Sequence, residues 1–183
     1  MEQTVTFISA EESDMLRPLK KLYKTAFPRS ERKPFGLILK NRREGKAEIL
    51  AAVDQNGTFC GLAISFFSEG LVLLAYFAVS PALRGRGIGA ELLRALRERY
   101  ADRKFFLEIE RTDQENDPSG LKARRKSFYL RNGMSETGLF VRLFGVELEI
   151  LSDRRTVSFE EYFRVYLEVS GKIAEKNVLL AER

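Results

Sequence analysis

A turn that contains three glycines, between an apolar run and an amphipathic run, is the segment whose residue types most clearly suggest chemistry. It reads Arg84-Gly85-Arg86-Gly87-Ile88-Gly89 and follows the apolar residues 71–79. A diphosphate can approach a backbone closely only where side chains are missing, and the free N–H groups of a helix's first turn then face the anion. Gly85, Gly87 and Gly89 would supply that clearance. The turn therefore predicts a site for linked phosphates.

Two arginines, Arg84 and Arg86, add positive charge beside the same turn. Their guanidinium groups suit phosphate oxygens, although both side chains can equally stay solvated at the rim. The backbone donors therefore carry the prediction. Taken alone, a glycine-rich turn is also compatible with a tight structural turn that has a basic flank.

Two other nucleotide-binding motifs can be compared with this turn. The P-loop ends in Gly-Lys-Ser/Thr, whereas this turn continues as Gly89-Ala90-Glu91. The dinucleotide fingerprint G-x-G-x-x-A fits Gly85, Gly87 and Ala90, and Glu108 or Glu110 follows at about the expected 20 residues. However, that fingerprint directly follows its strand within βαβ units, and this chain shows hairpins. A dinucleotide site stays open as the alternative.

Histidine is absent and Cys60 is the only cysteine. This composition excludes Ser-His and Cys-His nucleophiles, thiolate metal clusters and most zinc sites, so we expect no metal. Cys60 lies in an apolar run and is expected in the core. Proton transfer must use Tyr, Glu, Asp, Lys or water.

The turn resembles the acetyl-CoA signature Q/R-x-x-G-x-G/A of the GNAT superfamily of N-acetyltransferases, in which the defining positions are Arg84, Gly87 and Gly89. A second element, Phe128-Tyr129-Leu130-Arg131-Asn132-Gly133-Met134, resembles the family's F-Y-x-x-x-G-F, with Met in place of the last Phe. The likeness covers residues 4–152. More locally, residues 106–110 and 123–129 resemble a bacterial subgroup, many members of which have no assigned substrate.

The resemblance implies direct transfer of an acetyl group from acetyl-CoA, as co-substrate, to a primary amine, without an acyl-enzyme. In the family, the strand before the signature pairs with the pantetheine arm, and a backbone N–H there polarises the thioester oxygen. Those positions are Phe77, Ala78 and Val79. Residues 84–89 would hold the pyrophosphate, and Asn116 resembles a family residue that touches the cofactor arm, although it also fits an ordinary turn.

Tyr129 is the expected catalytic residue. A phenol with a pKa of about 10 is protonated at neutral pH and can donate to a departing sulfur whose pKa is about 8.5. Core packing is the alternative use of this side chain. The general base is unassigned because residues 71–79 contain no carboxylate. Glu108, Glu110 or water could serve, and period two puts both glutamates on one face, but structural ion pairing is an equal alternative.

Hydrophobic periodicity predicts the elements that position these residues. Helices are expected at 11–26, capped by Ser9 or Ser13, at 35–44, from Ile88 to about 100, and at 121–132. Strands are expected at 4–9, 48–54, 58–68, 71–79, 105–109, 137–144 and 146–151. A charged loop, residues 27–34, separates the first two helices and is expected to border the acceptor pocket.

The predicted fold is mixed α/β of the GNAT type, with a mostly antiparallel central sheet of 6–7 strands and helices on both faces. We expect a domain at residues 1–152. The tail 153–183 is expected to be a helical extension packed on the same domain, because its apolar residues from Phe159 to Leu167 follow helical spacing. A subunit contact, and thus a homodimer, is the second use of that face.

The remaining expectations come from charge and hydropathy. A net charge of +5 is compatible with phosphate-rich ligands or acidic partners without requiring either. The longest apolar run, 71–79, is too short to cross a bilayer, and the first residues do not resemble a secretory signal. We therefore expect a cytoplasmic protein that acts on a small-molecule or peptide amine, with neither nucleic acid nor membrane as a partner. The alternative function is a GNAT-like module that binds CoA without transferring its acetyl group.

Overall fold

A computed structural model describes residues 5–113, 117–153 and 156–182. The described chain forms two compact units, of which unit 1 contains residues 5–66 and 74–99 and unit 2 contains residues 67–73 and 100–182. Hydrogen-bonded strands follow the order β1-β2-β3-β4-β5-β7-β6-β8. The mixed, mostly antiparallel sheet with flanking helices confirms the predicted fold class. The described part has eight strands, one more than expected.

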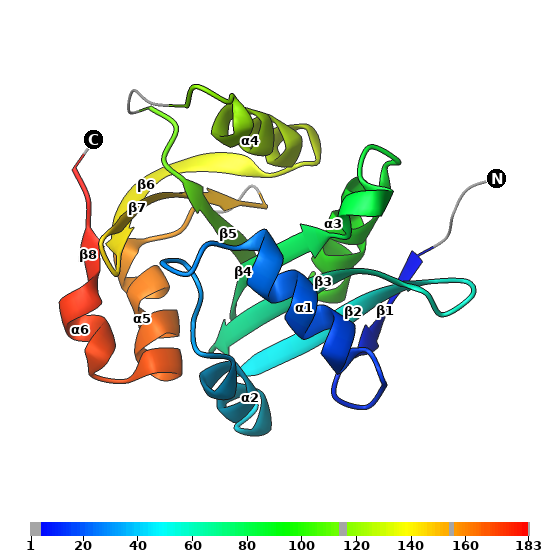
Figure 1. Ribbon diagram of the computed structural model, residues 1–183. Helices are drawn as coiled ribbons and strands as arrows, with labels where there is room; N and C mark the ends of the chain where they lie inside the picture. The colour runs from blue at the N-terminus through cyan, green and yellow to red at the C-terminus, as the bar shows by residue number, and fades with distance from the viewer. Residues whose placement is uncertain (1–4, 114–116, 154–155, 183) are drawn as a thin grey trace. The chain divides into compact units, whose positions relative to one another are not determined.

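Unit 1 holds the strands that precede the glycine-rich turn and the helix that follows it (Figure 1). Its elements are β1 (Val5–Ser9), α1 (Leu16–Ala26), α2 (Phe35–Arg43), β2 (Ala47–Asp54), β3 (Phe59–Ser68), β4 (Leu71–Val79), the 3-10 turn η1 (Pro81–Leu83) and α3 (Ile88–Arg99). Strands β1 and β2 pair antiparallel, as do β2 and β3. The hairpin between β3 and β4, residues 67–73, belongs to unit 2.

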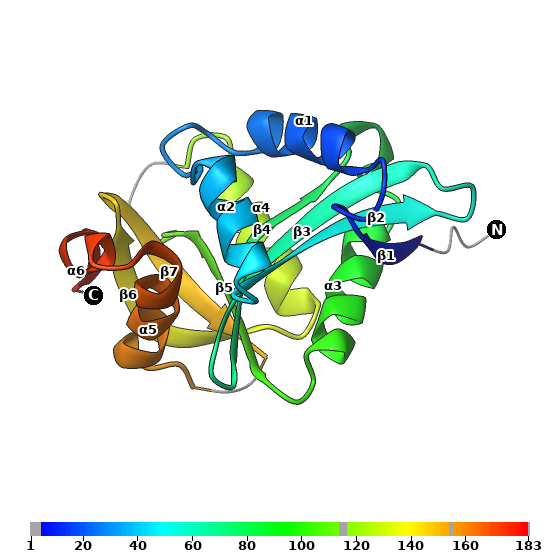
Figure 2. The same cartoon turned by 90° about the horizontal axis from the view of Figure 1, so that it is seen from below.

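Helices cover both faces of the strands in unit 1, with α1 and α2 on one side and α3 on the other (Figure 2). Alternation along β4 explains this arrangement, because successive side chains point to opposite faces. The Tyr76 ring contacts Tyr23 of α1, with 4.8 Å between ring centroids. Phe77 and Val79 instead pack against the buried cluster that contains Ile88 and Leu92 of α3.

The first helix begins later than the sequence indicates. We expected it from residue 11 behind a Ser9 or Ser13 cap, but α1 begins at Leu16, and its N-cap residue, Met15, makes no side-chain cap hydrogen bond. The Ser13 hydroxyl donates to the carbonyl of Ser9 at 3.0 Å and accepts from the N–H of Met15 at 3.3 Å. Such local hydroxyl–backbone bonds offer an alternative to the helix, so residues 10–15 form turns.

Unit 2 holds the remaining elements. They are β5 (Lys104–Glu110), α4 (Leu121–Arg131), β6 (Ser135–Leu143), β7 (Val146–Ser152), α5 (Phe159–Ser170), α6 (Ile173–Asn177) and β8 (Val178–Leu180). Strand β7 pairs antiparallel with both β5 and β6. Helices α4 and α5 lie on opposite sides of β6 and β7 (Figures 1 and 2).

The chain after residue 158 contains the predicted helix and two elements that were not predicted. Ser158 and Glu161 form a reciprocal capping box at the start of α5. Helix α6 and strand β8 follow, and β8 pairs antiparallel with β6 through Leu180 opposite Val141. No helix in the described ranges is long and apolar enough to span a bilayer.

Candidate functional site

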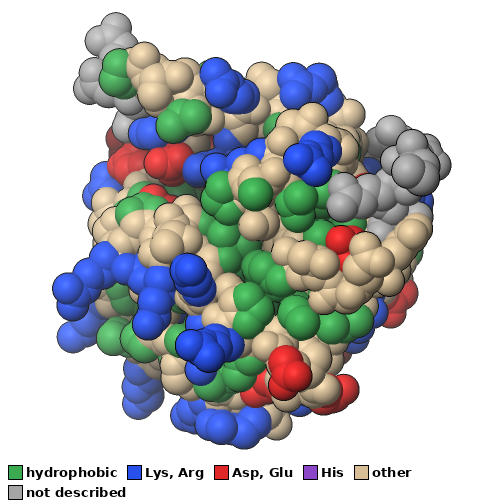
Figure 3. All heavy atoms as spheres, turned by 45° about the vertical axis from the view of Figure 1, so that its right-hand side comes forward, with side chains coloured by type: hydrophobic (Ala, Val, Ile, Leu, Met, Phe, Trp, Pro, Cys, Tyr) green, Lys and Arg blue, Asp and Glu red, His purple; other side chains and the backbone are tan. Residues whose placement is uncertain are grey.

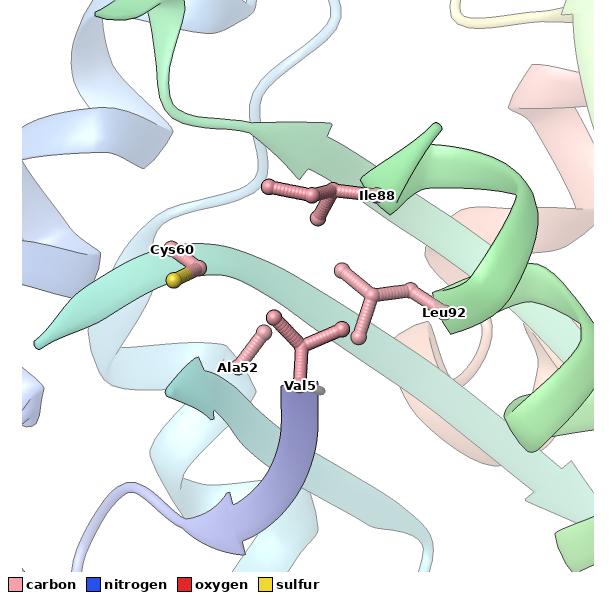
Figure 4. Packing of buried hydrophobic residues seen from close by; sticks show 5 residues of the cluster. All are labelled: Val5, Ala52, Cys60, Ile88 and Leu92. Carbon is pink, nitrogen blue, oxygen red and sulfur yellow. The ribbon is translucent and has the colours of Figure 1, made fainter. Parts of the chain in front are cut away.

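The glycine-rich turn forms an exposed arch with two buried ends, and we refer to residues 84–87 as the arch. Ile88, which follows the arch, belongs to a buried cluster with Val5, Ala52, Cys60 and Leu92, drawn in Figure 4. Leu83, which precedes the arch, packs against this cluster. Cys60 is fully buried there, as predicted. Residues 84–87 themselves are exposed. The core therefore fixes both ends of a segment whose backbone faces solvent.

Hydrogen bonds between backbone groups hold the entry to the arch. Ser80 donates its N–H to the Cys60 carbonyl at 2.8 Å, and Leu83 donates to the Ser80 carbonyl at 2.9 Å, which closes η1. Gly85 and Gly87 then take φ values of +77° and +80°. Side-chain-bearing residues rarely adopt this region, so the backbone path by itself favours glycine at both positions.

The space around these two glycines is open. A Cβ atom built on Gly85 or Gly87 would have no atom within 4 Å. The predicted clearance is therefore present, since no part of the described chain fills the volume beside the arch. Glycine is needed here for its conformation, and it also leaves that volume to a ligand.

The backbone amides around the arch are available to an anion. Ala90 and Glu91 donate their N–H groups to the Gly87 carbonyl, at 3.0 and 3.2 Å, and these bonds start α3. Within the described ranges, no protein group accepts a hydrogen bond from the N–H groups of residues 85–89. Five donors at the start of a 12-residue helix, beside open space, fit linked phosphates.

The side chains at the arch differ in how well they could contact a phosphate. Arg84 donates its Nε to the Val79 carbonyl at 3.3 Å, so its guanidinium turns back towards the end of β4. Arg86 is exposed, and within the described chain it has no acidic partner. Ile88 is only 2% exposed and could offer a ligand only its backbone N–H. Arg86 is thus the better placed of the two arginines to meet a phosphate.

Gly61 of β3 is a residue of this site that the sequence analysis missed. A Cβ on Gly61 would lie 2.5 Å from the Ala78 carbonyl oxygen and 3.3 Å from the Val79 Cα. Ala78 and Val79 end β4, the strand that we expect to align the pantetheine arm of acetyl-CoA. A glycine inside a predicted strand signals such a close approach, and that signal was available in the sequence.

Replacing Gly61 with Ala should move the end of β4. Because the clash is with backbone, the free energy of unfolding should fall by roughly 1 to 3 kcal/mol, as measured by urea titration. Gly36→Ala is the matched control, because a Cβ at Gly36 of α2 meets nothing within 4 Å. It should leave the stability unchanged or raise it by about 0.5 to 1 kcal/mol. Equal stabilities for the two variants would show that β3 and β4 are not in close contact at this point.

The loop at residues 27–34 is held against β4 by two tyrosine hydroxyl groups. Tyr76 accepts a hydrogen bond from the Lys33 N–H at 2.9 Å and donates to the Glu31 carbonyl at 2.9 Å. Tyr23 donates to the Lys33 carbonyl at 2.8 Å. Burial raises the pKa of Tyr23, while its hydrogen bonds to Tyr76 and Lys33 and the nearby Arg32 charge oppose this change. The loop is therefore fixed against Tyr76, one residue before Phe77 in β4.

Tyr129 belongs to unit 2, where it lies on α4. Its side chain is 8% exposed, and burial raises the pKa of the phenol to about 12, against which the Arg125 charge acts in part. The phenol is therefore protonated at neutral pH. Within the described residues, its hydroxyl makes no hydrogen bond to another protein group. Asn116, the other expected site residue near this helix, lies outside the described residues.

The two candidate bases on β5 both make structural contacts. Glu108 accepts hydrogen bonds from the hydroxyl groups of Tyr162 and Tyr166 of α5, each at 2.7 Å. Glu110 forms an ion pair with Arg125 of α4 at 2.6 Å. Their partners therefore lie on two different helices, α5 and α4, so the two carboxylates do not share the surroundings that the period-two spacing predicts. These contacts favour structural pairing, which was the alternative use of both residues.

Replacing Glu108 with Gln separates a structural role from a catalytic one. The two tyrosine bonds to the carboxylate are charge-assisted and partly buried, so the free energy of unfolding should fall by roughly 1 to 3 kcal/mol. Glu110→Gln, which breaks a more exposed pair on the same strand, should change it by less than about 1 kcal/mol. Acetyl transfer should continue in both. A loss of turnover of roughly 100-fold in either variant, with stability intact, would instead identify that glutamate as the base.

The basic run at the start of α4 is also engaged in unit 2. Besides the Arg125–Glu110 pair, Lys126 contacts the buried Glu149 at 2.8 Å and also pairs with Glu136. Desolvation lowers the pKa of Lys126, but the bonds to these carboxylates outweigh it and raise the pKa overall. These ion pairs join α4 to β5, β6 and β7.

Comparisons with known proteins agree with this architecture. The sequence model of the acetyltransferase (GNAT) family matches residues 16–134, which include β4, the arch, α3 and α4. The chain therefore belongs to the GNAT acetyltransferase family. No curated protein sequence matches it.

Solved structures share the fold at low sequence identity. A protein described as a GNAT-family acetyltransferase, from Bacteroides thetaiotaomicron, is 19% identical, with a TM-score of 0.73 over 92% of this chain and 98% of its own. The ribosomal-protein-S18-alanine N-acetyltransferase of Escherichia coli is 19% identical, with a TM-score of 0.58 over 85% and 96%. An aminoglycoside 6'-N-acetyltransferase in complex with coenzyme A is 16% identical, with a TM-score of 0.63 over 85% and 99%.

Proposed function

We propose that this chain binds acetyl-CoA at the arch and catalyses direct transfer of the acetyl group to a primary amine. The observation that carries the proposal is the set of five backbone N–H groups, residues 85–89, that lack a protein acceptor in the described chain and face open volume. Membership of an acetyltransferase family and the coenzyme A complex of a structural neighbour support it.

Two segments of unit 1, residues 77–79 and 85–89, would hold acetyl-CoA in this proposal. Residues 85–89 would hold the pyrophosphate through backbone donors, with Arg86 adding charge. The backbone of Phe77, Ala78 and Val79 would align the pantetheine arm and polarise the thioester oxygen. When bound, acetyl-CoA supplies the activated acyl group. Holding amine and thioester together removes the entropic cost of their encounter, which can contribute about 7 to 11 kcal/mol.

Tyr129 would donate a hydrogen bond to the departing sulfur. A pKa of about 12 keeps the phenol protonated. Because a thiol has a pKa of only about 8.5, the proton stays on the tyrosine at equilibrium, and the hydrogen bond stabilises the thiolate. Asn116 remains our proposed contact for the cofactor arm. The amine would lose its proton to water, since Glu108 and Glu110 make structural contacts.

Two measurements on the purified chain test this proposal. Acetyl-CoA should raise the melting temperature, whereas NAD should not, because β1, β2 and β3 pair antiparallel, unlike the parallel strands of a dinucleotide fold, and both candidate acidic residues are occupied. Thiol release in the presence of an amine library should then report transfer. A shift with NAD and none with acetyl-CoA would favour the dinucleotide alternative.

A second candidate function is a module that binds CoA without transferring the acetyl group. The observation that favours it is the absence of a free carboxylate on the described parts of β4 and β5, where a base would be expected. This alternative predicts the same rise in melting temperature with acetyl-CoA. It also predicts that no amine increases the rate of thiol release above the rate at which acetyl-CoA hydrolyses.

A further inference from the structure

Basic residues are concentrated in one segment of unit 1. Residues 17–46 contain 11 Lys and Arg against 2 Glu, a net charge of +9, whereas the whole chain carries +5, so the remainder carries −4. Blue Lys and Arg side chains are prominent beside green apolar ones on the face in Figure 3. The segment comprises α1, the loop at residues 27–34 and α2.

Helix α1 contributes a stripe of four basic residues with no acidic residue on the helix. Arg17, Lys20, Lys21 and Lys24 follow i, i+3, i+4 and i+7 spacing and therefore share one face. The buried residues Leu19, Leu22 and Tyr23 take the opposite face. The stripe is thus directed away from the core.

Among the described residues, no carboxylate balances the charge of this stripe. In the described part of the chain, no carboxylate lies within ion-pair distance of Arg17, Lys20, Lys21 or Lys24, and Lys20 lies over the Phe35 ring at 4.9 Å. By contrast, Arg42 of α2 pairs with Glu11 at 3.0 Å. Like charges at helical spacing repel one another, and an anionic partner would relieve this repulsion.

The loop offers an independent sign of an anionic ligand. The Nε atom of Arg32 is buried, and no described group accepts its hydrogen bond. Buried donors normally have partners, and a carboxylate is the usual partner of a guanidinium. Arg32 lies between Glu31 and Lys33, whose backbone groups bond to Tyr76 and Tyr23, so this unmet donor lies beside the clamp formed by the two tyrosines. That clamp fixes the loop against Tyr76, which precedes Phe77 in β4.

We propose that the acceptor amine belongs to an acidic peptide, whose carboxylates lie along the basic stripe of α1 and reach Arg32. This rests on the proposed function, because it takes Phe77 as part of the acyl-transfer site. The stripe extends about 10 Å along the helix, the length of about three residues of an extended chain, so it fits several carboxylates in series. A nucleic acid fits less well, because Tyr23 and Tyr76 are buried and Phe35 is covered by Lys20.

Direct binding tests this inference without requiring acetyl transfer. Three ten-residue peptides with a free N-terminal amine and a C-terminal fluorophore would carry Glu and Asp, Gln and Asn, or Arg at positions 2–5. Arg in place of Lys keeps the number of primary amines constant. Fluorescence anisotropy should show the acidic peptide binding at least about tenfold more tightly than the neutral one, with the preference falling as salt rises.

A charge-reversed helix provides the decisive variant. Arg17→Glu with Lys21→Glu removes the net charge of α1, and the substitution at position 17 lies in the first turn, where the helix dipole favours an acidic residue. This variant should lose the preference for the acidic peptide. Lys172→Glu with Lys176→Glu makes the same change of charge in unit 2, where both lysines are exposed, and should keep the preference.

Three results would overturn the inference. They are equal binding of the acidic and neutral peptides, a preference that survives in the Arg17 and Lys21 variant, and tighter binding of a single-stranded oligonucleotide of equal charge. None of them bears on the acetyl-CoA site, which is tested by the melting temperature. A failure of the acceptor inference is therefore distinct from a failure of the proposed function.

Discussion

Replacing Gly87 with Glu should abolish the rise in melting temperature that acetyl-CoA produces. At a ligand concentration of 100 times Kd, binding should stabilise the unmodified chain by about 2.7 kcal/mol, which corresponds to roughly 5 to 10 °C for a chain of this size. A carboxylate at Gly87 would occupy the open volume beside the arch and repel phosphate. Differential scanning fluorimetry with and without acetyl-CoA measures the effect.

Gly57→Glu is the matched control for this variant. Gly57 lies in the turn between β2 and β3 with a φ of +75°, close to the +80° of Gly87, and a Cβ there also meets nothing within 4 Å. Both substitutions therefore impose a similar backbone strain, about 1 to 2 kcal/mol. The control should lose stability without acetyl-CoA and still gain the full shift with it. A full shift in the Gly87 variant would contradict the assignment of the arch.

Replacing Tyr129 with Phe should lower kcat by roughly 100-fold or more while the Kd for acetyl-CoA stays nearly unchanged. Under the proposed mechanism, the substitution removes only the hydrogen bond to the departing sulfur. Because no described group bonds the Tyr129 hydroxyl, its removal should not lower the melting temperature. The phenol, with a pKa of about 12, is protonated in folded and unfolded chains at pH 7, so the comparison needs no correction for ionisation near neutrality.

Tyr162→Phe is the control, because the Tyr162 hydroxyl makes a structural hydrogen bond. Its hydroxyl donates to Glu108 at 2.7 Å, so this variant should lower the melting temperature and leave kcat unchanged. The two tyrosines therefore predict opposite patterns of stability and turnover. If Tyr129→Phe has full turnover with an acceptor amine, Tyr129 has no part in the chemistry and only packs α4.

The elements around the arch were predictable because their signals are local. Residues 71–79 form one uninterrupted apolar run, and β4 has the same bounds. From Ile88 onward, apolar side chains repeat at helical spacing and are buried in α3. The turn between them needs positive φ at Gly85 and Gly87, which glycine makes visible in the sequence.

The elements that were missed depend on contacts distant in sequence. Strand β8 has three residues, too few to show alternation, and it forms because β6 offers an unpaired edge. The Phe144 N–H donates to the Asn177 carbonyl at 2.7 Å, which joins α6 to the hairpin of β6 and β7. No local pattern signals a bond across that separation.

For the expected site residues, the hydrogen-bond and ion-pair partners could not be read from the sequence. The hydrogen bond from Arg84 to the Val79 carbonyl depends on the 3-10 conformation of η1. The residue types from Pro81 to Arg84 do not specify that conformation. The tyrosine partners of Glu108 come from α5, 54 and 58 residues away. The basic stripe of α1, in contrast, could be read from the sequence, but the lack of opposing carboxylates could not.

A crystal structure of the chain with acetyl-CoA bound tests the central claim most directly. The account predicts both phosphorus atoms of the pyrophosphate beside the arch, with their oxygens accepting hydrogen bonds from the backbone N–H groups of residues 85–89. Acetyl-CoA bound elsewhere, or at the arch without those bonds, would contradict it.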